Sequence, residues 1–324
     1  MSQQIIAADR LMDEALIEKC LSFLNVQTSS AVTYKNNVKA FFEYLYIHGI
    51  SQPQREHVFE YRNSLIKTGK KPSTVRAYLI ALRIFFRWAA HEGIYDDIAA
   101  YVRVRNQDYG HRRDALTEHQ VHDLLEGIDR RTLRGLRNYA ILMVMVIGGL
   151  RCVEISRAKI GDFRRRGRSI VLYVHGKGHE DSGVEYVKLP HMARQALRVY
   201  LKRRGIVEEN APLFASTGNR GTGSSHLSTR EISRIVKNAL INAGYNSDRL
   251  CAHSLRHTAV TLALKGGEGL EAVKEFARHK SLNTTLIYSH VIDRENCTCS
   301  QTIERMIFGG RKKRKKAKTS PAKA

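Results

Sequence analysis

The chain has 324 residues, of which 43% are hydrophobic and 26% charged, a composition typical of one large globular domain or two ordinary ones. Its longest apolar run, 140–147, is too short to span a bilayer, and the first residues lack the basic and apolar stretches of a signal peptide. Five sparse cysteines form no disulfide framework. These features exclude the membrane-spanning and disulfide-stapled classes and predict a cytoplasmic protein.

The strong positive charge predicts a polyanionic partner. Lys and Arg number 54 against 31 Asp and Glu, which gives a formal net charge of +23. Such an excess suits a phosphate backbone, because neutralising phosphates releases condensed counterions. The segment 311–324 is rich in Lys and Arg and holds no acidic residue, yet most of the excess lies outside it. Ribosomal and membrane-surface proteins are equally basic, so the charge alone does not identify the polyanion.

Residues 9–95 are predicted to form a helical domain. Apolar residues recur at helical spacing in four segments, the last of which starts at Pro72 or Ser73 and runs to Gly93. Its broad apolar stripe includes Trp88, which we expect in the core of a helical bundle. The basic side chains of this region are candidates for DNA contacts, with a solvated surface as the alternative: Lys35, Lys39, Lys70, Lys71, Arg76, Arg83 and Arg87.

A change of pattern follows at residues 96–113, which are basic and lack periodicity. This predicts an interdomain linker that crosses a DNA backbone, with Arg103 and Arg105 as contacts. Helices are then expected at 117–127 and 133–147. Thr117 and Gln120 have the spacing of a capping box at the start of the first.

The remaining segments show either the hydrophobic spacing of a strand or that of a helix. The runs 169–174 and 184–190 predict a β-hairpin, with Lys177 in its turn region. Helices are expected at 191–203, 228–243, from His253 to 264, at 269–278 and at 282–290. A short amphipathic helix is predicted at 300–308, and the basic tail 309–324 is expected to be disordered.

Arg151 follows the pair Gly148-Gly149 at the mouth of a predicted helix. Glycine permits close approach of the backbone to a ligand, and a guanidinium can hold two phosphate oxygens at once. Glu154, three residues on, is positioned to brace the guanidinium. The alternative is an ordinary Arg–Glu pair on a helix surface.

The segment His253-Ser254-Leu255-Arg256-His257 places an imidazole three residues before a guanidinium, which puts both on one face of a helix. The imidazole could transfer a proton beside a guanidinium that binds the phosphate. His257 is expected to point elsewhere and to be structural. No acidic residue or cysteine completes a metal site here, and Cys297 and Cys299 are too isolated to form one, so we expect neither metal nor cofactor.

His279 and Tyr288 lie nine positions apart, and a short helix beginning near Asn283 is expected to carry the tyrosine. A lone tyrosine is normally a packed aromatic with a satisfied hydroxyl. Its place after the His-x-x-Arg segment and a further histidine makes it a candidate nucleophile.

The order Gly-Leu-Arg, Lys, His-x-Leu-Arg, His and Tyr resembles that of the tyrosine recombinase (phage-integrase-like) family, over essentially the whole chain. The resemblance implies a mostly α fold with a small β-sheet or hairpin in the catalytic domain, arranged as a two-domain, C-shaped DNA clamp. It implies these parts: a core-binding, SAM-like domain at 9–95, a linker at 96–113, a catalytic domain at 114–308 and a basic tail at 309–324.

The same resemblance implies a role for each site residue. Tyr288 is the nucleophile that forms a 3′-phosphotyrosyl link, and Arg151 and Arg256 clamp the scissile phosphate. Lys177 is the acid toward the leaving oxygen, and His253 and His279 are supporting imidazoles. One departure stands beside the site: Ala277-Arg278 occupies the position where many relatives have Leu-Gly. Arg278 is therefore expected to alter DNA contact or assembly.

The implied reaction is sequential strand exchange through a Holliday junction by a homotetramer on paired double-stranded DNA sites. The helix at 300–308 would dock on a neighbouring protomer or on its own domain. Two alternatives remain, a type IB-like topoisomerase with the same chemistry and a non-catalytic basic DNA-binding protein of the same fold. Neither a Walker A loop nor an acidic cluster for two metals is present in the sequence.

Overall fold

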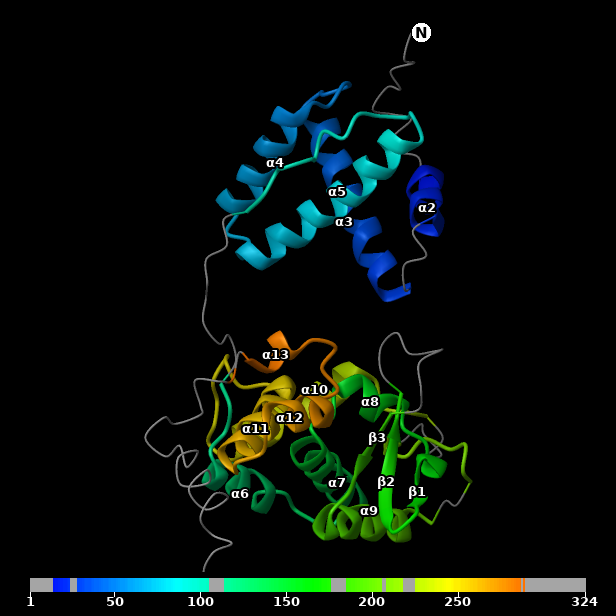
Figure 1. Ribbon diagram of the computed structural model, residues 1–324, viewed down its shortest axis with the longest axis vertical. Helices are drawn as coiled ribbons and strands as arrows, with labels where there is room; N and C mark the ends of the chain where they lie inside the picture. The colour runs from blue at the N-terminus through cyan, green and yellow to red at the C-terminus, as the bar shows by residue number, and fades with distance from the viewer. Residues whose placement is uncertain are drawn as a thin grey trace, which may run out of the picture. The chain divides into compact units, whose positions relative to one another are not determined.

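The computed structural model describes residues 14–23, 28–104, 114–175, 185–205, 208–217, 225–286 and 288. The chain divides into two compact units, Met1–Gly110 and His111–Ala324 (Figure 1). Each unit has its own hydrophobic core. Within these described ranges, no helix combines the length and apolar character needed to cross a membrane.

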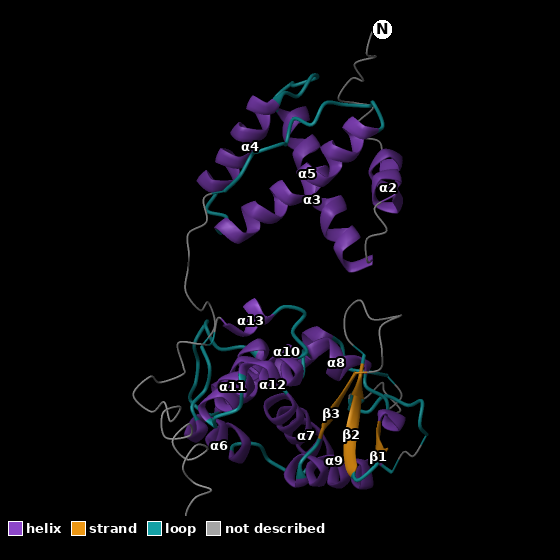
Figure 2. Ribbon diagram, viewed as in Figure 1, coloured by secondary structure: helices purple, strands orange, loops and turns teal. Residues whose placement is uncertain are grey.

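The first unit is helical, as predicted (Figure 2). Its helices are α2 (Glu14–Phe23), α3 (Thr28–Ile47), α4 (Arg55–Lys67) and α5 (Pro72–His91). Pro72 starts α5 at a position where its missing N–H is not needed. The predicted place of Trp88 in the core is confirmed by an exposed fraction of 3%. Edge-to-face contacts between rings of α3 and α5, such as Phe42 with Phe85, hold this bundle together.

The second unit holds the other described helices: α6 (Glu118–Glu126), α7 (Leu133–Gly148), α8 (Cys152–Arg157), α9 (His191–Arg204), α10 (Thr229–Asn242), α11 (Ala252–Lys265), α12 (Leu270–Ala277) and α13 (Leu282–Leu286). A 3₁₀ turn, η1 (Ile160–Asp162), follows α8. The predicted capping box is present, because Thr117 and Gln120 each accept a hydrogen bond from the backbone N–H of the other. Helix α7 is buried on most sides and packs against α9 and α11.

A three-stranded antiparallel sheet completes this unit, in the order β1 (Phe163–Arg166), β2 (Ser169–Val174), β3 (Glu185–Lys188). The predicted hairpin is confirmed as β2–β3, with Val174 opposite Glu185. Strand β1 was not predicted, since its run of arginines shows no apolar alternation. The guanidinium of Arg164 lies 4.4 Å from the ring centre of Tyr173 on β2. This cation–π contact supports a charged edge strand.

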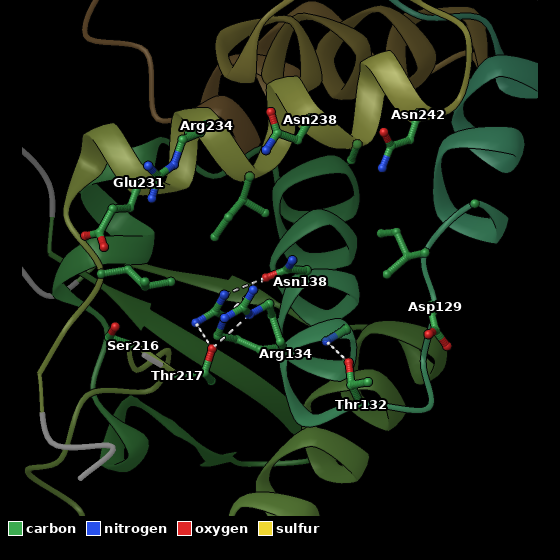
Figure 3. A pocket seen from close by; sticks show the side chains of 17 residues that line it. Asp129, Thr132, Arg134, Asn138, Ser216, Thr217, Glu231, Arg234, Asn238 and Asn242 are labelled. Carbon is green, nitrogen blue, oxygen red and sulfur yellow. Dashed lines mark hydrogen bonds between the residues drawn. The ribbon is translucent and has the colours of Figure 1, made fainter. Parts of the chain in front are cut away.

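Arg137 ties the segment 215–217 to the start of α7. Its side chain is buried, and its guanidinium donates to the carbonyl of Ala215 at 2.8 Å and to Thr217 Oγ1 at 3.3 Å. These groups lie beside a polar pocket (Figure 3). Arg234, Asn238 and Asn242 of α10 line its other side. The pocket thus lies at the opposite end of α7 from Gly148.

Gly135, in the first turn of α7, offers a sharp test of this packing. A Cβ atom at this position would lie 1.7 Å from the carbonyl oxygen of Asp129. We therefore expect Gly135→Ala to lower the free energy of unfolding by about 1–3 kcal/mol through overpacking. At Gly269 a Cβ would meet nothing within 4 Å, so Gly269→Ala should lower it by less than about 1 kcal/mol. Urea denaturation of both variants measures the difference, and equal effects would contradict the packing described.

Candidate active site

The turn between α7 and α8 presents Arg151. Gly149 ends α7 in the left-handed conformation with φ of 58°, and a Cβ there would lie 3.2 Å from the ring of Phe276. Both the backbone conformation and the space favour glycine. Arg151 follows as the residue that precedes the first turn of α8. Its side chain is 34% exposed, so its guanidinium remains accessible to a ligand.

The predicted brace by Glu154 is present. The Glu154 carboxylate accepts hydrogen bonds from the backbone N–H and the guanidinium of Arg151, both at 2.8 Å. Its side chain is fully buried, and it also pairs with Arg278 at 2.9 Å. Burial by itself raises the pKa of Glu154, but the charge of Arg278 and the bonds from Arg151 together hold the pKa below its usual value. The carboxylate therefore stays ionised between two guanidiniums.

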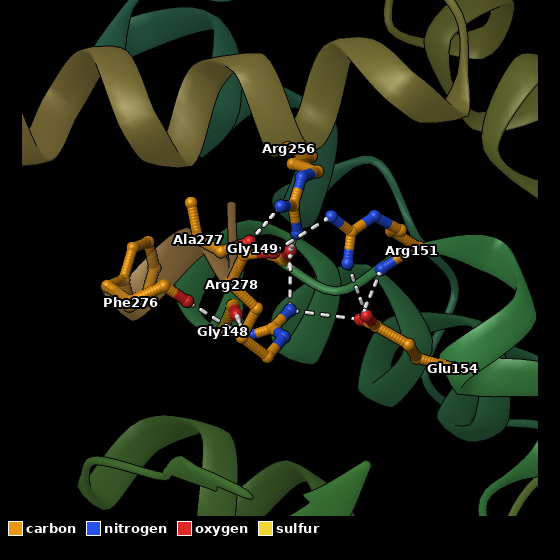
Figure 4. A network of polar contacts seen from close by, with 8 residues as sticks. All are labelled: Gly148, Gly149, Arg151, Glu154, Arg256, Phe276, Ala277 and Arg278. Carbon is orange, nitrogen blue, oxygen red and sulfur yellow. Dashed lines mark hydrogen bonds and ion pairs between the residues drawn. The ribbon is translucent and has the colours of Figure 1, made fainter. Parts of the chain in front are cut away.

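Arg256 adds a third guanidinium to the same place (Figure 4). It lies on α11 with 3% of its surface exposed, and it donates to the carbonyl of Gly149 at 2.6 Å and to that of Ala277. Burial first, and the charges of Arg151 and Arg278 second, lower the pKa of Arg256 to about 9. Three guanidiniums around one carboxylate leave an excess of positive charge, which favours an anionic ligand.

His279 follows this cluster directly and belongs to the same electrostatic environment. Its Nδ1 lies 2.9 Å from Thr285 Oγ1 on α13. Burial, and after it the neighbouring charges of Arg256, Arg151 and Arg278, together lower the pKa of His279 to about 4. His279 is therefore neutral at physiological pH in the free protein, and it is placed to take part in hydrogen bonding.

Tyr288 lies just beyond α13, which is shorter than predicted. The expected helix at 282–290 stops at Leu286, and the residue after it lies outside the described chain. The phenol is 6% exposed and packs with Val260, Leu264, Val273 and Ala277. Burial raises the pKa of Tyr288 to about 12, although the nearby charge of Arg256 opposes this. The tyrosine is thus protonated and sheltered in this conformation.

The hydroxyl of Tyr288 contacts Nδ1 of His257, which corrects the expectation that His257 points elsewhere. The ring of His257 also meets that of His253 edge-on, with centroids 4.6 Å apart. Sequence spacing contains the signal that was missed, because residues 253 and 257 are separated by four positions and share a face of α11. His257 therefore belongs to the site as the contact of the phenol.

Five of the six residues with implied catalytic roles come near one another in the structure. The pKa of His279 is lowered by burial and then by the nearby Arg256, Arg151 and His253. The charge of Arg256 also acts on the pKa of Tyr288. Lys177 lies outside the described residues, so its role stays a prediction.

The side chains predicted to contact DNA differ in their exposure to solvent. Most of them are exposed: Lys39, Lys70, Lys71, Arg76, Arg87 and Arg103. Lys35 pairs with Glu18 at 2.7 Å, and Arg83 is half-buried on α5. Arg105 lies outside the described residues. The side chain of Arg278 is only 5% exposed and is bound within the cluster of Figure 4. All these DNA contacts stay predictions.

Comparison with known proteins matches both units to sequence families. The model of the phage integrase family matches residues 114–295, and that of the phage integrase N-terminal SAM-like domain matches residues 17–93. The tyrosine recombinase XerD of Listeria monocytogenes is 27% identical over 290 residues, which cover 85% of this chain and 94% of the relative. The tyrosine recombinase XerC of Corynebacterium glutamicum is 30% identical over 227 residues, 70% of each chain.

A similar fold is seen in the crystal structure of the XerH site-specific recombinase bound to its difH substrate in a pre-cleavage complex. The TM-score is 0.65 at 22% identity, and the match covers 86% of this chain and 82% of that one. The fold expected from the sequence, mostly helical with a small sheet, is confirmed.

The depressed pKa of His279 predicts a pH-dependent stability. The unfolded histidine titrates near 6.5 and the folded one near 4, so the unfolded chain binds more protons between these values. The free energy of unfolding should fall as the pH drops through this window, by about 1–2 kcal/mol at pH 5 from this residue. In His279→Gln this part of the pH dependence should vanish.

Urea denaturation at pH 7 and pH 5 measures the effect. The substitution His191→Gln, at an exposed position at the start of α9, serves as the control. A wild-type pH dependence in the His279 variant would show that this histidine does not titrate as described.

Proposed function

The chain belongs to the phage integrase family, and from this membership we propose that it is a site-specific DNA recombinase. It would cleave and rejoin strands through a 3′-phosphotyrosyl intermediate and exchange them in sequence through a Holliday junction. Integration, excision and resolution are all reactions of this kind. The relatives bear the name tyrosine recombinase, and the XerH structure contains its DNA substrate.

The observation that supports the proposal most directly is the gathering of Arg151 and Arg256 around the Gly149 turn, close to His279 and Tyr288. These residues come from four separate segments of the second unit. Packing for stability alone gives no reason to collect like charges in a partly buried place, where they repel one another. A bound phosphodiester would supply negative charge that offsets the repulsion between these cations.

The two guanidiniums act chiefly on the transition state. When the tyrosine oxygen attacks phosphorus, negative charge grows on the non-bridging oxygens, and preplaced donors stabilise it without reorganisation. Arg151 is partly exposed and fixed by Glu154, so it can meet the phosphate with its planar fork. Loss of one such donor lowers a rate by roughly 10²–10³.

Proton transfers complete the reaction. The phenol of Tyr288 has a pKa of about 12, so its proton must pass to a base as the new bond to phosphorus forms, and the base we propose is the imidazole of His253. His257 contacts the hydroxyl in the sheltered conformation, and His253 lies directly against that imidazole. We propose that Lys177 donates a proton to the 5′-oxygen as it leaves. The covalent phosphotyrosyl link conserves the phosphodiester for rejoining, so neither ATP nor a metal is required.

The proposal extends to the parts of the chain and to its assembly. Residues 9–95 would bind DNA as a core-binding domain and 96–113 would link it to the catalytic domain at 114–308, with a basic tail at 309–324. Strand exchange requires two paired double-stranded sites, hence a homotetramer. The predicted helix at 300–308, outside the described residues, is the candidate for exchange between protomers. The enzyme would act on DNA in the cytoplasm.

Tyr288→Phe tests the nucleophile. The variant should bind DNA like the wild type and form no covalent adduct with a nicked recombination site, because the attacking oxygen is gone. Tyr173→Phe on β2 is the control and should form adduct normally. Denaturing gel electrophoresis of labelled DNA detects the adduct, and an adduct with the Tyr288 variant would assign the nucleophile elsewhere.

A substrate with two target sites distinguishes recombination from the topoisomerase alternative. The sites themselves come from sequencing DNA that co-purifies with the protein. We expect recombinant products from a plasmid with two sites and none from a plasmid with no site. Relaxation of both plasmids without recombinants would support a topoisomerase, and binding without any adduct would support a non-catalytic DNA-binding protein.

A further inference from the structure

We propose that Arg278 is a positioning residue for Arg151, which it holds in place through the buried carboxylate of Glu154. The inference rests on the proposed recombinase function and assigns a role to the residue next to His279. Arg278 ends α12 in the left-handed conformation, with φ of 53°, and its side chain turns into the cluster shown in Figure 4.

The contacts of Arg278 form a bridge between two segments. Its Nη2 pairs with Glu154 Oε2 at 2.9 Å and donates to the carbonyl of Gly149 at 3.1 Å, while Nη1 donates to the carbonyl of Phe276 at 2.8 Å. Glu154 in turn holds both the backbone and the guanidinium of Arg151. The guanidinium of Arg278 therefore connects the end of α12 to the start of α8.

Burial favours this positioning role over a DNA contact. The side chain of Arg278 is 5% exposed, whereas that of Arg151 is 34% exposed. Both terminal nitrogens of Arg278 already donate to protein oxygens, and its Nε, also enclosed, has no partner within the described residues. A phosphate that approaches from solvent meets Arg151 first.

Without the Arg278 guanidinium, the fully buried carboxylate of Glu154 would keep Arg151 as its one ion-pair partner among the described residues. Glu154 Oε2 would then keep only the backbone N–H of Arg151 as a donor among the described residues, and the carboxylate would hold the Arg151 guanidinium less firmly in its orientation. Catalysis depends on such orientation more steeply than binding does. The chemical step should suffer while DNA affinity is retained.

Arg278→Gly is the first variant, because glycine adopts the left-handed conformation readily and the change removes the guanidinium without adding backbone strain. We expect adduct formation at saturating DNA to slow by roughly 10- to 100-fold, with unchanged DNA affinity and salt dependence. Arg278→Lys should recover part of the rate, since an ammonium retains the charge but cannot make the same forked contacts.

The control is Arg131→Gln, which removes another Arg–carboxylate pair of the same unit, to Asp129, at an exposed position. It should react at the wild-type rate. Thermal unfolding is recorded for each variant. If Arg278→Gly does not fold, Arg278→Gln takes its place, because it keeps a hydrogen-bonding side chain and loses the charge.

A double-mutant cycle with Glu154→Gln shows whether Arg278 acts through the carboxylate. If it does, removing Arg278 from the Glu154 variant should slow the reaction far less than removing it from the wild type. Independent, multiplicative effects would overturn the inference. So would weaker DNA binding with a salt slope reduced by about one and an unchanged rate at saturation, the signature of a phosphate contact.

These outcomes are separate from those that test the function itself. If the wild type forms no adduct, the proposed function fails. If the wild type forms adduct and Arg278→Gly matches its rate at saturating DNA, the recombinase proposal stands and the positioning role of Arg278 is wrong.

Discussion

The pairing of one buried carboxylate with two guanidiniums organises the whole site. Glu154 is fully buried, and it holds Arg151 on one side and Arg278 on the other. An isolated carboxylate in such a place would be costly, and so would the buried guanidinium of Arg278 alone. Together they fix the ends of three elements, α7, α8 and α12, against one another. Because Arg256 joins through the carbonyl of Gly149, the cluster keeps more positive than negative charge.

This residual charge connects the resting structure to its proposed ligand. The pKa of Arg256 is lowered to about 9 and that of His279 to about 4, in both cases by burial first and by the neighbouring cations second. An anion bound among these groups would raise both pKa values again, since it favours their protonated forms. The site is thus electrostatically complementary to the phosphate and to the still more negative transition state. Tyr288, whose pKa is about 12, stays protonated until attack begins.

Sequence patterns predicted the structural features that depend on the spacing of nearby residues. The amphipathic helices, the capping box at Thr117 and the β2–β3 hairpin follow from periodicities within a few residues. The order of the motif residues likewise indicated which side chains would gather. Strand β1 was not predicted because its arginines contact rings on β2 and β3, and its own sequence shows no apolar alternation.

The contacts within the site were the least predictable part. Arg278 and Glu154 are 124 positions apart in the chain, and no local rule pairs them. The meeting of His257 with Tyr288 depends on how α11 faces the turn after α13, which tertiary packing decides. His257 shares a face of α11 with His253, contrary to our expectation, and no local pattern shows what lies opposite that face.

The backbone conformation at position 278 does not favour arginine, but the contacts of its side chain do. A left-handed residue after a helix is best served by glycine, and any other side chain strains the backbone. The strain is offset when the side chain makes contacts that glycine cannot, and here it neutralises a carboxylate that would otherwise face one cation. Arg278 and Glu154 are therefore coupled, because the buried acid and the buried guanidinium stabilise each other.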